Sequence, residues 1–264
     1  MKLTFLGTTA SIPDAGEDSP CFLVNDRYLF DCGFDVCGGL RECGVLPDNI
    51  RYIFFTHMHH DHYIGLAGLL FYFIHNHAIH PEMGSVPLDE LTILGPAEDV
   101  GRVVNLACDF LQMGGQFYTD VPRPKVVALN PGDTFKTEDL FVQTGAARHP
   151  VQALSYRIEE KNGTALAASG DTAYNPNTFA LYRGCAALIH DCTMGLITDL
   201  EPPETRKNGH SNLYEAVRCA AETGIPVLFP VHMAKNYAAC AAAYIEDTAG
   251  VTITLPERGR TYTL

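Results

Sequence analysis

The chain has 264 residues, of which 47% are hydrophobic and 19% charged, a balance typical of a globular protein and not of a disordered one. Asp and Glu number 31 against 18 Lys and Arg, giving a formal net charge of -13, so the average field of the molecule repels polyanions. The composition therefore disfavours long nucleic acid as a partner, but it leaves room for a small anionic substrate, because bound metal ions or a local basic patch reverse the potential at a single site.

The cysteines and the apolar segments predict a location for the protein. Its nine cysteines are odd in number, scattered and never spaced as Cys-x-x-Cys, which favours reduced thiols in the cytoplasm. The chain starts with a predicted strand and shows no export signal. The longest apolar run, residues 63–74, is about half of the roughly 20 residues needed to cross a bilayer. We therefore expect a cytoplasmic protein with no membrane partner.

In the first half of the chain, a β-meander is followed by alternating strands and helices. Asn25-Asp26 predicts a tight hairpin turn, and residues 80–89, with two Pro and one Gly, predict a loop. Strands are expected at 2–6, 21–24, 27–30, 51–55 and 91–94, and helices at 36–43, 63–75 and 97–113.

The second half repeats this order. Strands are expected at 126–129, around 135, and at 140–144, 155–158, 165–168, 187–190 and 227–230, and helices at 175–183, 212–222 and 237–248. In both halves polar side chains of metal-binding type directly follow apolar strands. The pattern predicts an α/β fold in which two mixed β-sheets pack face to face with helices outside, as one domain over residues 1–264.

A dense cluster of histidines follows the strand at 51–55, in the run His57-Met58-His59-His60-Asp61-His62. In an extended backbone His57 and His59 project to the same side, whereas Asp61 and His62 enter the next helix and turn toward a neighbouring position. Four His and one Asp in six residues are too dense for an ordinary polar turn. We expect this loop to serve two metal ions.

The pattern Thr-His-x-His-x-Asp-His resembles the signature of the metallo-β-lactamase superfamily. Phe5-Leu6-Gly7-Thr8 and Phe30-Asp31-Cys32-Gly33 are similar to that family's opening strand and its buried structural Asp, and the likeness is greatest to the ribonuclease Z-like branch. It extends over nearly the whole chain and implies the metallo-β-lactamase αβ/βα four-layer sandwich.

The resemblance also implies a set of metal ligands. One metal would be held by His57, His59 and His149, the other by Asp61, His62 and His232, with Asp171 shared between them. These ligand types suit two Zn²⁺ ions, and Mn²⁺ or Fe²⁺ fit them as well. Taken singly, His149 and His232 are equally compatible with ordinary surface or core histidines; their positions after predicted strands favour the ligand interpretation.

Two catalytic residues are expected beside the metals. Asp61 would orient the attacking water or take its proton, and His210 would act as general acid, since Gly209-His210-Ser211-Asn212 is similar to a helix-start motif of the branch. The alternative for His210 is a structural histidine. Asp191 lies where the branch commonly carries Glu and is interpreted as a support for a ligand imidazole, although its side chain is shorter.

Four further histidines receive a weaker interpretation. His60 is expected to face solvent or to lie behind the ligands, because it occupies the variable position of the motif. His75, His77 and His80 favour a solvated helix end and loop over an accessory site, because no carboxylate lies at metal-binding spacing. Residues 71–88 can form either a lid over the site or the surface of a homodimer.

The predicted function is that of a dinuclear metal-dependent hydrolase, with water activated between two cations. Only 21 residues separate His149 from Asp171, where ribonuclease Z proper carries a long basic arm for transfer RNA. The resemblance and the acidic charge together favour a phosphodiesterase for a small or nucleotide-like phosphodiester. The alternatives are hydrolysis of another ester-type bond (sulfate ester, lactone or β-lactam), transfer RNA 3′-end cleavage, or a catalytically silent metal-binding protein.

Overall fold

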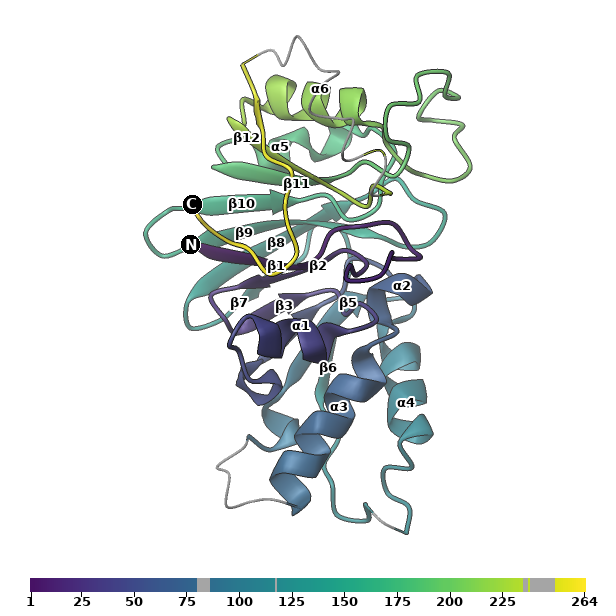
Figure 1. Cartoon of the computed structure of the whole chain (residues 1–264), viewed down its shortest axis with the longest axis vertical. Helices are drawn as coiled ribbons and strands as arrows, with labels where there is room; N and C mark the ends of the chain where they lie inside the picture. Colours follow the sequence, from purple (N-terminus) through teal and green to yellow (C-terminus); the bar gives the residue numbers. More distant parts are fainter. Residues whose placement is uncertain (80–85, 117, 235–236, 238–249) are drawn as a thin grey trace.

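The computed structural model describes residues 1–79, 86–116, 118–234, 237 and 250–264. Two mixed sheets of seven strands pack face to face, and helices cover the outer surface of each (Figure 1). The four-layer αβ/βα arrangement expected from the resemblance is therefore confirmed. The helix expected at 237–248 lies outside the described residues except for Tyr237.

The first sheet joins an antiparallel meander to four parallel strands. Asn25 and Asp26 form the hairpin turn with φ angles of 51° and 57°, as a two-residue hairpin turn requires. The strand order is β14 (Thr261–Thr263), β1 (Lys2–Gly7), β2 (Cys21–Val24), β3 (Tyr28–Phe30), β4 (Tyr52–Phe54), β5 (Thr92–Pro96) and β6 (Lys125–Leu129). Its helices are α1 (Val36–Glu42), α2 (His60–Tyr63), α3 (Leu66–Ile74) and α4 (Val100–Phe110).

The second sheet has the same plan, with an antiparallel meander leading into parallel strands. Its order is β13 (Thr252–Ile253), β12 (Val227–Val231), β11 (Ala187–Asp191), β10 (Ala165–Ala168), β9 (Leu154–Glu160), β8 (Leu140–Ala146) and β7 (Thr134–Lys136). Helices α5 (Phe179–Tyr182) and α6 (Leu213–Thr223) cover it. Asn212 and Glu215 form a capping box at the start of α6, which fixes the chain that leads into the helix from the predicted site.

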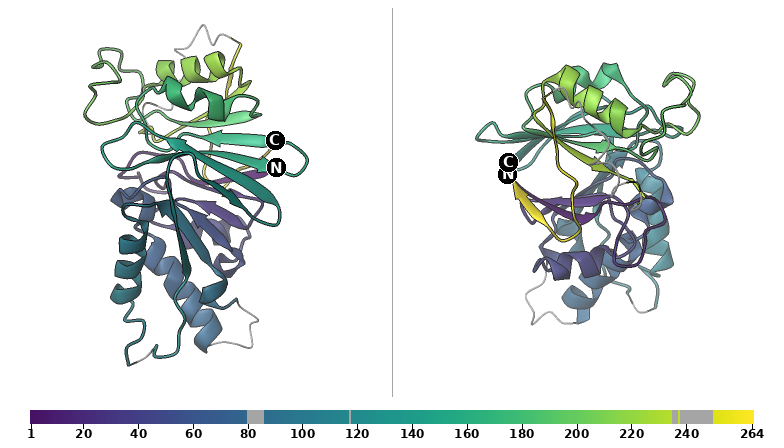
Figure 2. Two further views of the ribbon diagram at one scale, coloured as in Figure 1. Left: turned by 180° about the vertical axis from the view of Figure 1, so that it is seen from behind. Right: turned by 45° about the horizontal axis from the view of Figure 1, so that its top comes forward.

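Aromatic side chains hold the two sheets together. Phe30 and Phe54 stack with ring centroids 4.9 Å apart, and Tyr156 from the other sheet meets both edge-on at 5.6 and 5.9 Å. The Tyr156 hydroxyl donates to the Phe55 carbonyl oxygen at 2.7 Å. The chain ends meet at one side of this core, where β1 pairs with β14, as both views of Figure 2 show. The Tyr156 contacts join β9 of the second sheet to β3 and β4 of the first, next to the residues that follow β4.

Some predicted boundaries were wrong. The helix expected at 63–75 is two helices, because the Gly65 N–H donates to the Cys32 carbonyl oxygen at 3.1 Å instead of continuing the helix, and a Cβ at Gly65 would lie 2.0 Å from the Gly33 carbonyl oxygen. Beyond α3 it continues as a π-helix, His75–Ile79. The helix expected at 175–183 is a 3-10 turn, Pro176–Thr178, followed by the short α5. Strands β13 and β14 were not predicted.

Two short 3-10 turns complete the connections, Pro47–Asn49 before β4 and Leu88–Glu90 before β5. Within the described part of the chain, no helix is both long and apolar enough to span a membrane.

Candidate metal centre

The predicted ligands meet where strands from both sheets end. Thr56 to His62 follow β4, Asp171 follows β10 and His232 follows β12, while His149 lies in the loop between β8 and β9. The strands β4, β10 and β12 belong to the parallel parts of their sheets, and side chains that follow parallel strands collect at one edge. The fold therefore brings together residues that lie up to 175 positions apart, counted from His57 to His232.

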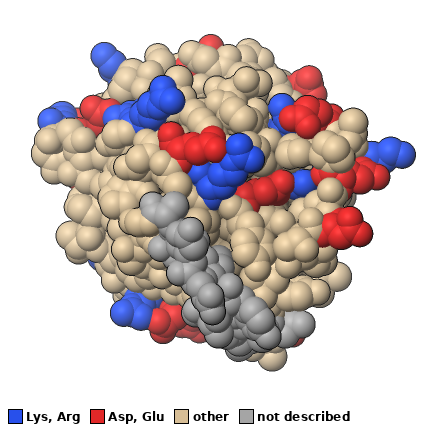
Figure 3. Space-filling model, turned by 90° about the horizontal axis from the view of Figure 1, so that it is seen from above, with Lys and Arg blue, Asp and Glu red and all other residues tan. Residues whose placement is uncertain are grey.

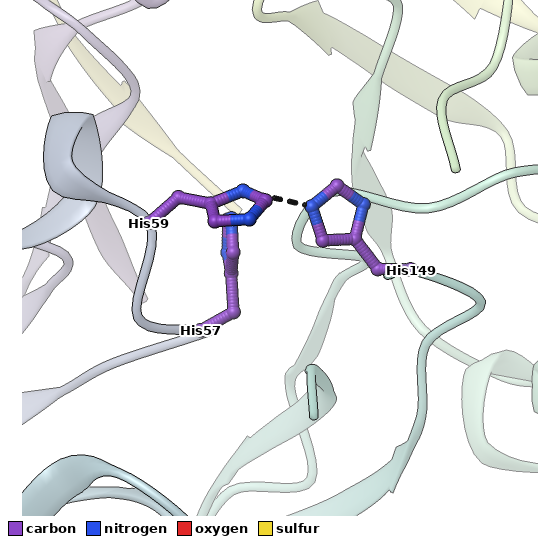
Figure 4. A group of neighbouring side chains, drawn as sticks. All are labelled: His57, His59 and His149. Carbon is purple, nitrogen blue, oxygen red and sulfur yellow. Dashed lines mark hydrogen bonds between the residues drawn. The ribbon is translucent and has the colours of Figure 1, made fainter. Parts of the chain in front are cut away.

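Three histidines form the first group. The ligand nitrogens of His57, His59 and His149 all lie within 4.8 Å of one another, and the three rings converge in Figure 4. His149 Nε2 lies 3.0 Å from His59 Nδ1. His149 Nδ1 lies 3.1 Å from the Gly209 carbonyl oxygen, to which it donates, so its Nε2 carries the lone pair that faces the group. The trio expected for one metal is thus assembled.

Gly209 is required for this contact. Its φ angle is 64°, and a Cβ there would lie 2.8 Å from the His149 Cα and 2.9 Å from its Nδ1. Any side chain at this position would displace the imidazole, so the glycine sets how closely the loop before α6 approaches the first group.

Asp61, His62 and His232 form the second group. His232 Nε2 lies 3.1 Å from Asp61 Oδ2, and His62 Nε2 lies 3.4 Å from the same oxygen. Asp171 Oδ2 lies 3.3 Å from His232 Nε2 and 3.4 Å from His62 Nε2. It also lies 3.7 Å from His57 Nε2 in the first group. One carboxylate oxygen therefore faces both groups, the arrangement that a shared ligand requires.

Asp31 and Thr56 orient two of these imidazoles from behind. The Thr56 hydroxyl donates its only proton to Asp31 Oδ2 at 2.8 Å, so it must accept from His57 Nδ1 at 3.1 Å. His62 Nδ1 donates to the same Asp31 oxygen at 2.8 Å. Both rings therefore carry their proton on Nδ1 and turn Nε2 toward Asp171.

The Nε2 atoms of His57 and His62 indicate whether the site fits a metal ion. Both are buried and make no hydrogen bond to any residue that the structure describes. An unsatisfied buried nitrogen is costly unless it meets a cation or holds a proton. Buried imidazole lone pairs beside carboxylates are a donor set that suits zinc. The residues present therefore fit the implied metal pair.

The electrostatics also favour cations. Burial opposes ionisation of Asp171, but the neighbouring imidazoles of His232, His62 and His57 hold its pKa well below the ordinary value. Burial would lower the pKa of His232, but Asp171 and Asp61 raise it to about 9. Burial likewise opposes a raised pKa at His62, which Asp171 and Asp31 nevertheless raise well above the ordinary value. Where no metal is bound, these two imidazolium ions supply the positive charge that the carboxylates need.

Two residues at the site, Asp31 and His232, adopt a left-handed backbone conformation. Asp31 has a φ of 58° and His232 a φ of 65°, and neither is glycine. Such conformations cost on the order of 1–3 kcal/mol each and cluster at functional sites. The strain lets the chain turn sharply at the ends of β3 and β12 and point both side chains inward.

His210 lies beside the first group. Its ring centroid is 5.1 Å from that of His149, and its Nδ1 donates to Asp191 Oδ2 at 2.9 Å. Burial lowers the pKa of His210, but the Asp191 carboxylate outweighs it and raises the pKa. The side chain is 17% exposed, unlike that of His57, which is fully buried. Asp191 therefore contacts His210 directly, whereas the sequence predicted contact with a ligand imidazole.

One residue with a role at the site was missed. The Thr193 hydroxyl lies between Asp191, His210 and His232. Thr193 follows an acidic residue at the end of a strand, and this position was the available signal.

Three further described histidines, His60, His75 and His77, do not join either group. His60 is exposed, His75 and His77 lie in the π-helix beyond α3, and His80 lies outside the described residues. None of these described histidines belongs to a group with metal-binding spacing. Eight cysteines are free thiols and buried or half-buried, and Cys240 lies outside the described residues.

Comparisons with known proteins agree with this geometry. A family model for a beta-lactamase superfamily domain matches residues 26–233, a range that contains every predicted ligand. Ribonuclease BN from Enterobacter sp. (strain 638) is 27% identical, with 90% of each chain covered. The metallo-beta-lactamase fold protein YhfI from Bacillus subtilis superposes with a TM-score of 0.76 at 21% identity, covering 99% of this chain and 98% of that one. The short form of human tRNase Z gives 0.73 at 21% identity, covering 100% and 99%.

Proposed function

The chain belongs to the metallo-β-lactamase superfamily, in its ribonuclease Z-like branch, and we propose that it is a dinuclear metal-dependent phosphodiesterase for small or nucleotide-like substrates. The observation that carries the proposal is the position of Asp171, whose Oδ2 lies within 3.7 Å of an imidazole from each group. The side chains that would hold the two ions are His57, His59, Asp61, His62, His149, Asp171 and His232.

Two divalent cations, when bound, lower the pKa of a bound water and neutralise charge on phosphoryl oxygens. Zinc fits the donor set best, and Mn²⁺ or Fe²⁺ are the alternatives. The two carboxylates then have separate tasks. Asp171 is 5% exposed and faces both groups, so it holds the two sets together. Asp61 is 13% exposed, so its carboxylate can meet an incoming water, orient it and accept its proton.

His210 supplies the proton to the leaving group. Its Nδ1 donates to Asp191, so a proton for the leaving group must come from Nε2 of the imidazolium form. The Asp191 carboxylate raises the pKa of His210 and so favours this form. Because the ring is partly exposed and adjoins His149, it can reach a leaving oxygen beside the first group.

Three features favour a small substrate over transfer RNA. Strands β9 and β10 are joined by a tight turn, closed by Gly163 N–H donating to the Glu160 carbonyl oxygen, so no arm extends there. On the face above α6, acidic and basic side chains are interspersed, and its described part shows no continuous basic surface (Figure 3). The alignment with the Enterobacter relative runs over 293 positions although this chain has 264 residues, so the relative carries insertions that this chain lacks.

A second candidate is RNA 3′-end cleavage, because the sequence relative is named ribonuclease BN and a structural neighbour is a tRNase Z. The two candidates differ in the size of the phosphodiester that the site accepts. A nuclease would need phosphate contacts along the RNA, and these come chiefly from Lys and Arg.

Hydrolysis of bis(p-nitrophenyl) phosphate by zinc- or manganese-loaded protein tests the proposal, with a precursor transfer RNA assayed in parallel. We expect turnover of the diester by the wild type, its loss in Asp171→Ala, and no cleavage of the RNA. Asp89→Ala removes an exposed carboxylate on the turn Leu88–Glu90 and is the matched control.

Three results would contradict the proposal. Cleavage of the RNA with the small diester untouched would favour the nuclease. Turnover confined to a sulfate ester, lactone or β-lactam would assign a different bond to the same site. Stoichiometric metal without turnover on any ester would identify a metal-binding protein that is not a catalyst.

A further inference from the structure

The hydroxyl of Thr193 contacts three polar side chains of the site, those of Asp191, His232 and His210. Its Oγ1 is 2.6 Å from Asp191 Oδ1, 2.9 Å from His232 Nδ1 and 3.1 Å from His210 Nδ1. Thr193 stands two residues beyond the end of β11, and its backbone N–H also donates to Asp191 Oδ1, at 2.8 Å. The side chain is thus held by its own backbone in contact with both imidazoles.

The direction of each hydrogen bond follows from counting donors. Asp191 accepts backbone N–H groups from Thr172, Thr193 and Ser211 and the Nδ1 proton of His210, so both of its oxygens act as acceptors. A hydroxyl has one proton and two lone pairs, and the Thr193 proton goes to Asp191 at the shortest of the three distances. The hydroxyl can then only accept from the two imidazoles.

Both imidazoles must therefore carry a proton on Nδ1. For His232 this leaves Nε2, on the side that faces Asp61 and Asp171, as the nitrogen that binds a metal ion when one is present and a second proton when none is. For His210 the same proton is shared between Thr193 and Asp191, and Nε2 is the nitrogen left to face the substrate. One hydroxyl thus accepts from Nδ1 of two rings with different tasks, alone for His232 and together with Asp191 for His210, among the contacts of the described residues.

We propose that Thr193 is a positioning residue that couples the metal ligand His232 to the proton donor His210 through a single hydroxyl. The inference rests on the proposed function for the task of His210, but its effect on His232 concerns metal binding alone. The hydroxyl lies close to both rings, and moving it would turn both.

Thr193→Val tests the inference because valine keeps the shape of the side chain and removes the hydroxyl. We expect it to weaken binding of one of the two zinc ions by about 10- to 100-fold, the range for losing a partner of a metal-bound histidine, and to lower kcat as well. Thr193→Ser retains the hydroxyl and should restore both to within about threefold. Affinities are measured by competition with a chromophoric chelator.

The tautomers give a readout that a merely structural role would not move. In zinc-loaded protein with ¹⁵N-labelled histidine, we expect His232 and His210 to carry protons on Nδ1 in the wild type and in Thr193→Ser. In Thr193→Val we expect His232 to lose this uniform state, whereas His210 keeps Asp191 as an acceptor for its Nδ1 proton. Thr223→Val is the matched control, because the Thr223 hydroxyl is buried and donates to the Cys219 and Ala220 carbonyl oxygens within α6. It should leave metal binding and tautomers unchanged.

Unchanged zinc affinities and tautomers in Thr193→Val would overturn the inference. It would also be overturned by a Thr193→Ser variant as weak as Thr193→Val, because the methyl group would then be what matters. A wild type that binds two zinc ions and cleaves no phosphodiester would contradict the proposed function instead, and the affinity and tautomer comparison would still decide the role of Thr193.

Discussion

Two Asp–Thr pairs support the imidazoles of the site in the same way. The first half of the site consists of Asp31, Thr56, His57 and His62, and the second half of Asp191, Thr193, His210 and His232. Behind the first half, Thr56 donates to Asp31, and this pair accepts the Nδ1 protons of His57 and His62. Behind the second half, Thr193 donates to Asp191, and this pair accepts the Nδ1 protons of two further histidines, His210 and His232. The first pair comes from the ends of two neighbouring parallel strands, β3 and β4, whereas both members of the second pair come from the end of one parallel strand, β11.

The two halves differ in how exposed their imidazole rings are. His57 and His62 are 0% and 1% exposed, and both face Asp171. In the second half His232 is 4% exposed and faces the same carboxylate, but His210 is 17% exposed. Among the four rings with an Asp–Thr support, the three proposed metal ligands are enclosed and the proposed proton donor, His210, is more open. His59 and His149, the proposed ligands without such a support, are half-buried as well, so exposure distinguishes the two proposed roles only within the supported rings.

Removing the residue that the halves share should have the largest effect. Asp171→Asn keeps the shape and removes the charge that faces both groups, so we expect kcat/KM to fall by about 10³-fold or more. Metal ions contribute several kcal/mol of charge stabilisation, and each 1.4 kcal/mol or so is tenfold in rate. Steady-state kinetics with metal analysis checks this. Near-wild-type turnover would show that the two groups do not act together.

The comparison of His62→Gln with His210→Gln tests the division of roles directly. His210→Gln should lower kcat by at least about 100-fold, the usual contribution of a general acid, and leave the zinc content unchanged. His62→Gln should lower the zinc content itself. If His210→Gln also loses zinc, the partly exposed ring is a ligand and the distinction by exposure is wrong.

Asp191→Asn should change the pH profile. Asp191 raises the pKa of His210, and an acid with a raised pKa keeps its proton to higher pH. Without that charge the proton is lost at lower pH, so the basic limb of the kcat profile should move to lower pH. Asp31→Asn should leave this limb in place and weaken zinc binding about 10- to 100-fold. If the basic limb does not move in Asp191→Asn, His210 is not the proton donor.

The smallest effect is expected in chelator-treated protein. The pKa of His232 is raised from 6.5 to about 9 by Asp171 and Asp61 against burial, so its protonation stabilises the fold fully below 6.5. This contribution should be lost as the pH rises from 6.5 to about 9. Denaturant unfolding across that range checks it. The zinc-loaded protein should lack this decline, because the metal takes the place of the proton; an identical decline in both would contradict this.

The sequence predicted much of the fold and of the candidate site for a physical reason. The resemblance implied Asp171 and His232, and their positions after predicted apolar strands agreed with it, because residues that follow parallel strands are brought to one edge of the sheet. The role of Thr193 could not be found in this way, because it depends on how closely β11, β12 and the loop at Gly209 approach one another.

The errors in the fold have a related cause. The break between α2 and α3 comes from the hydrogen bond that the Gly65 N–H donates to the Cys32 carbonyl oxygen, which joins residues 33 positions apart. Strands β13 and β14 are two and three residues long, too short for a periodic pattern, and they exist because they pair with β12 and β1. Such features depend on tertiary contacts that no local pattern carries.

The most direct test of the account is a crystal structure of the zinc-loaded protein with diffraction recorded on both sides of the zinc absorption edge. The account predicts two anomalous peaks about 3.5–4 Å apart, with the Asp171 carboxylate between them and three further side chains around each. A single peak, or peaks away from Asp171, would contradict it.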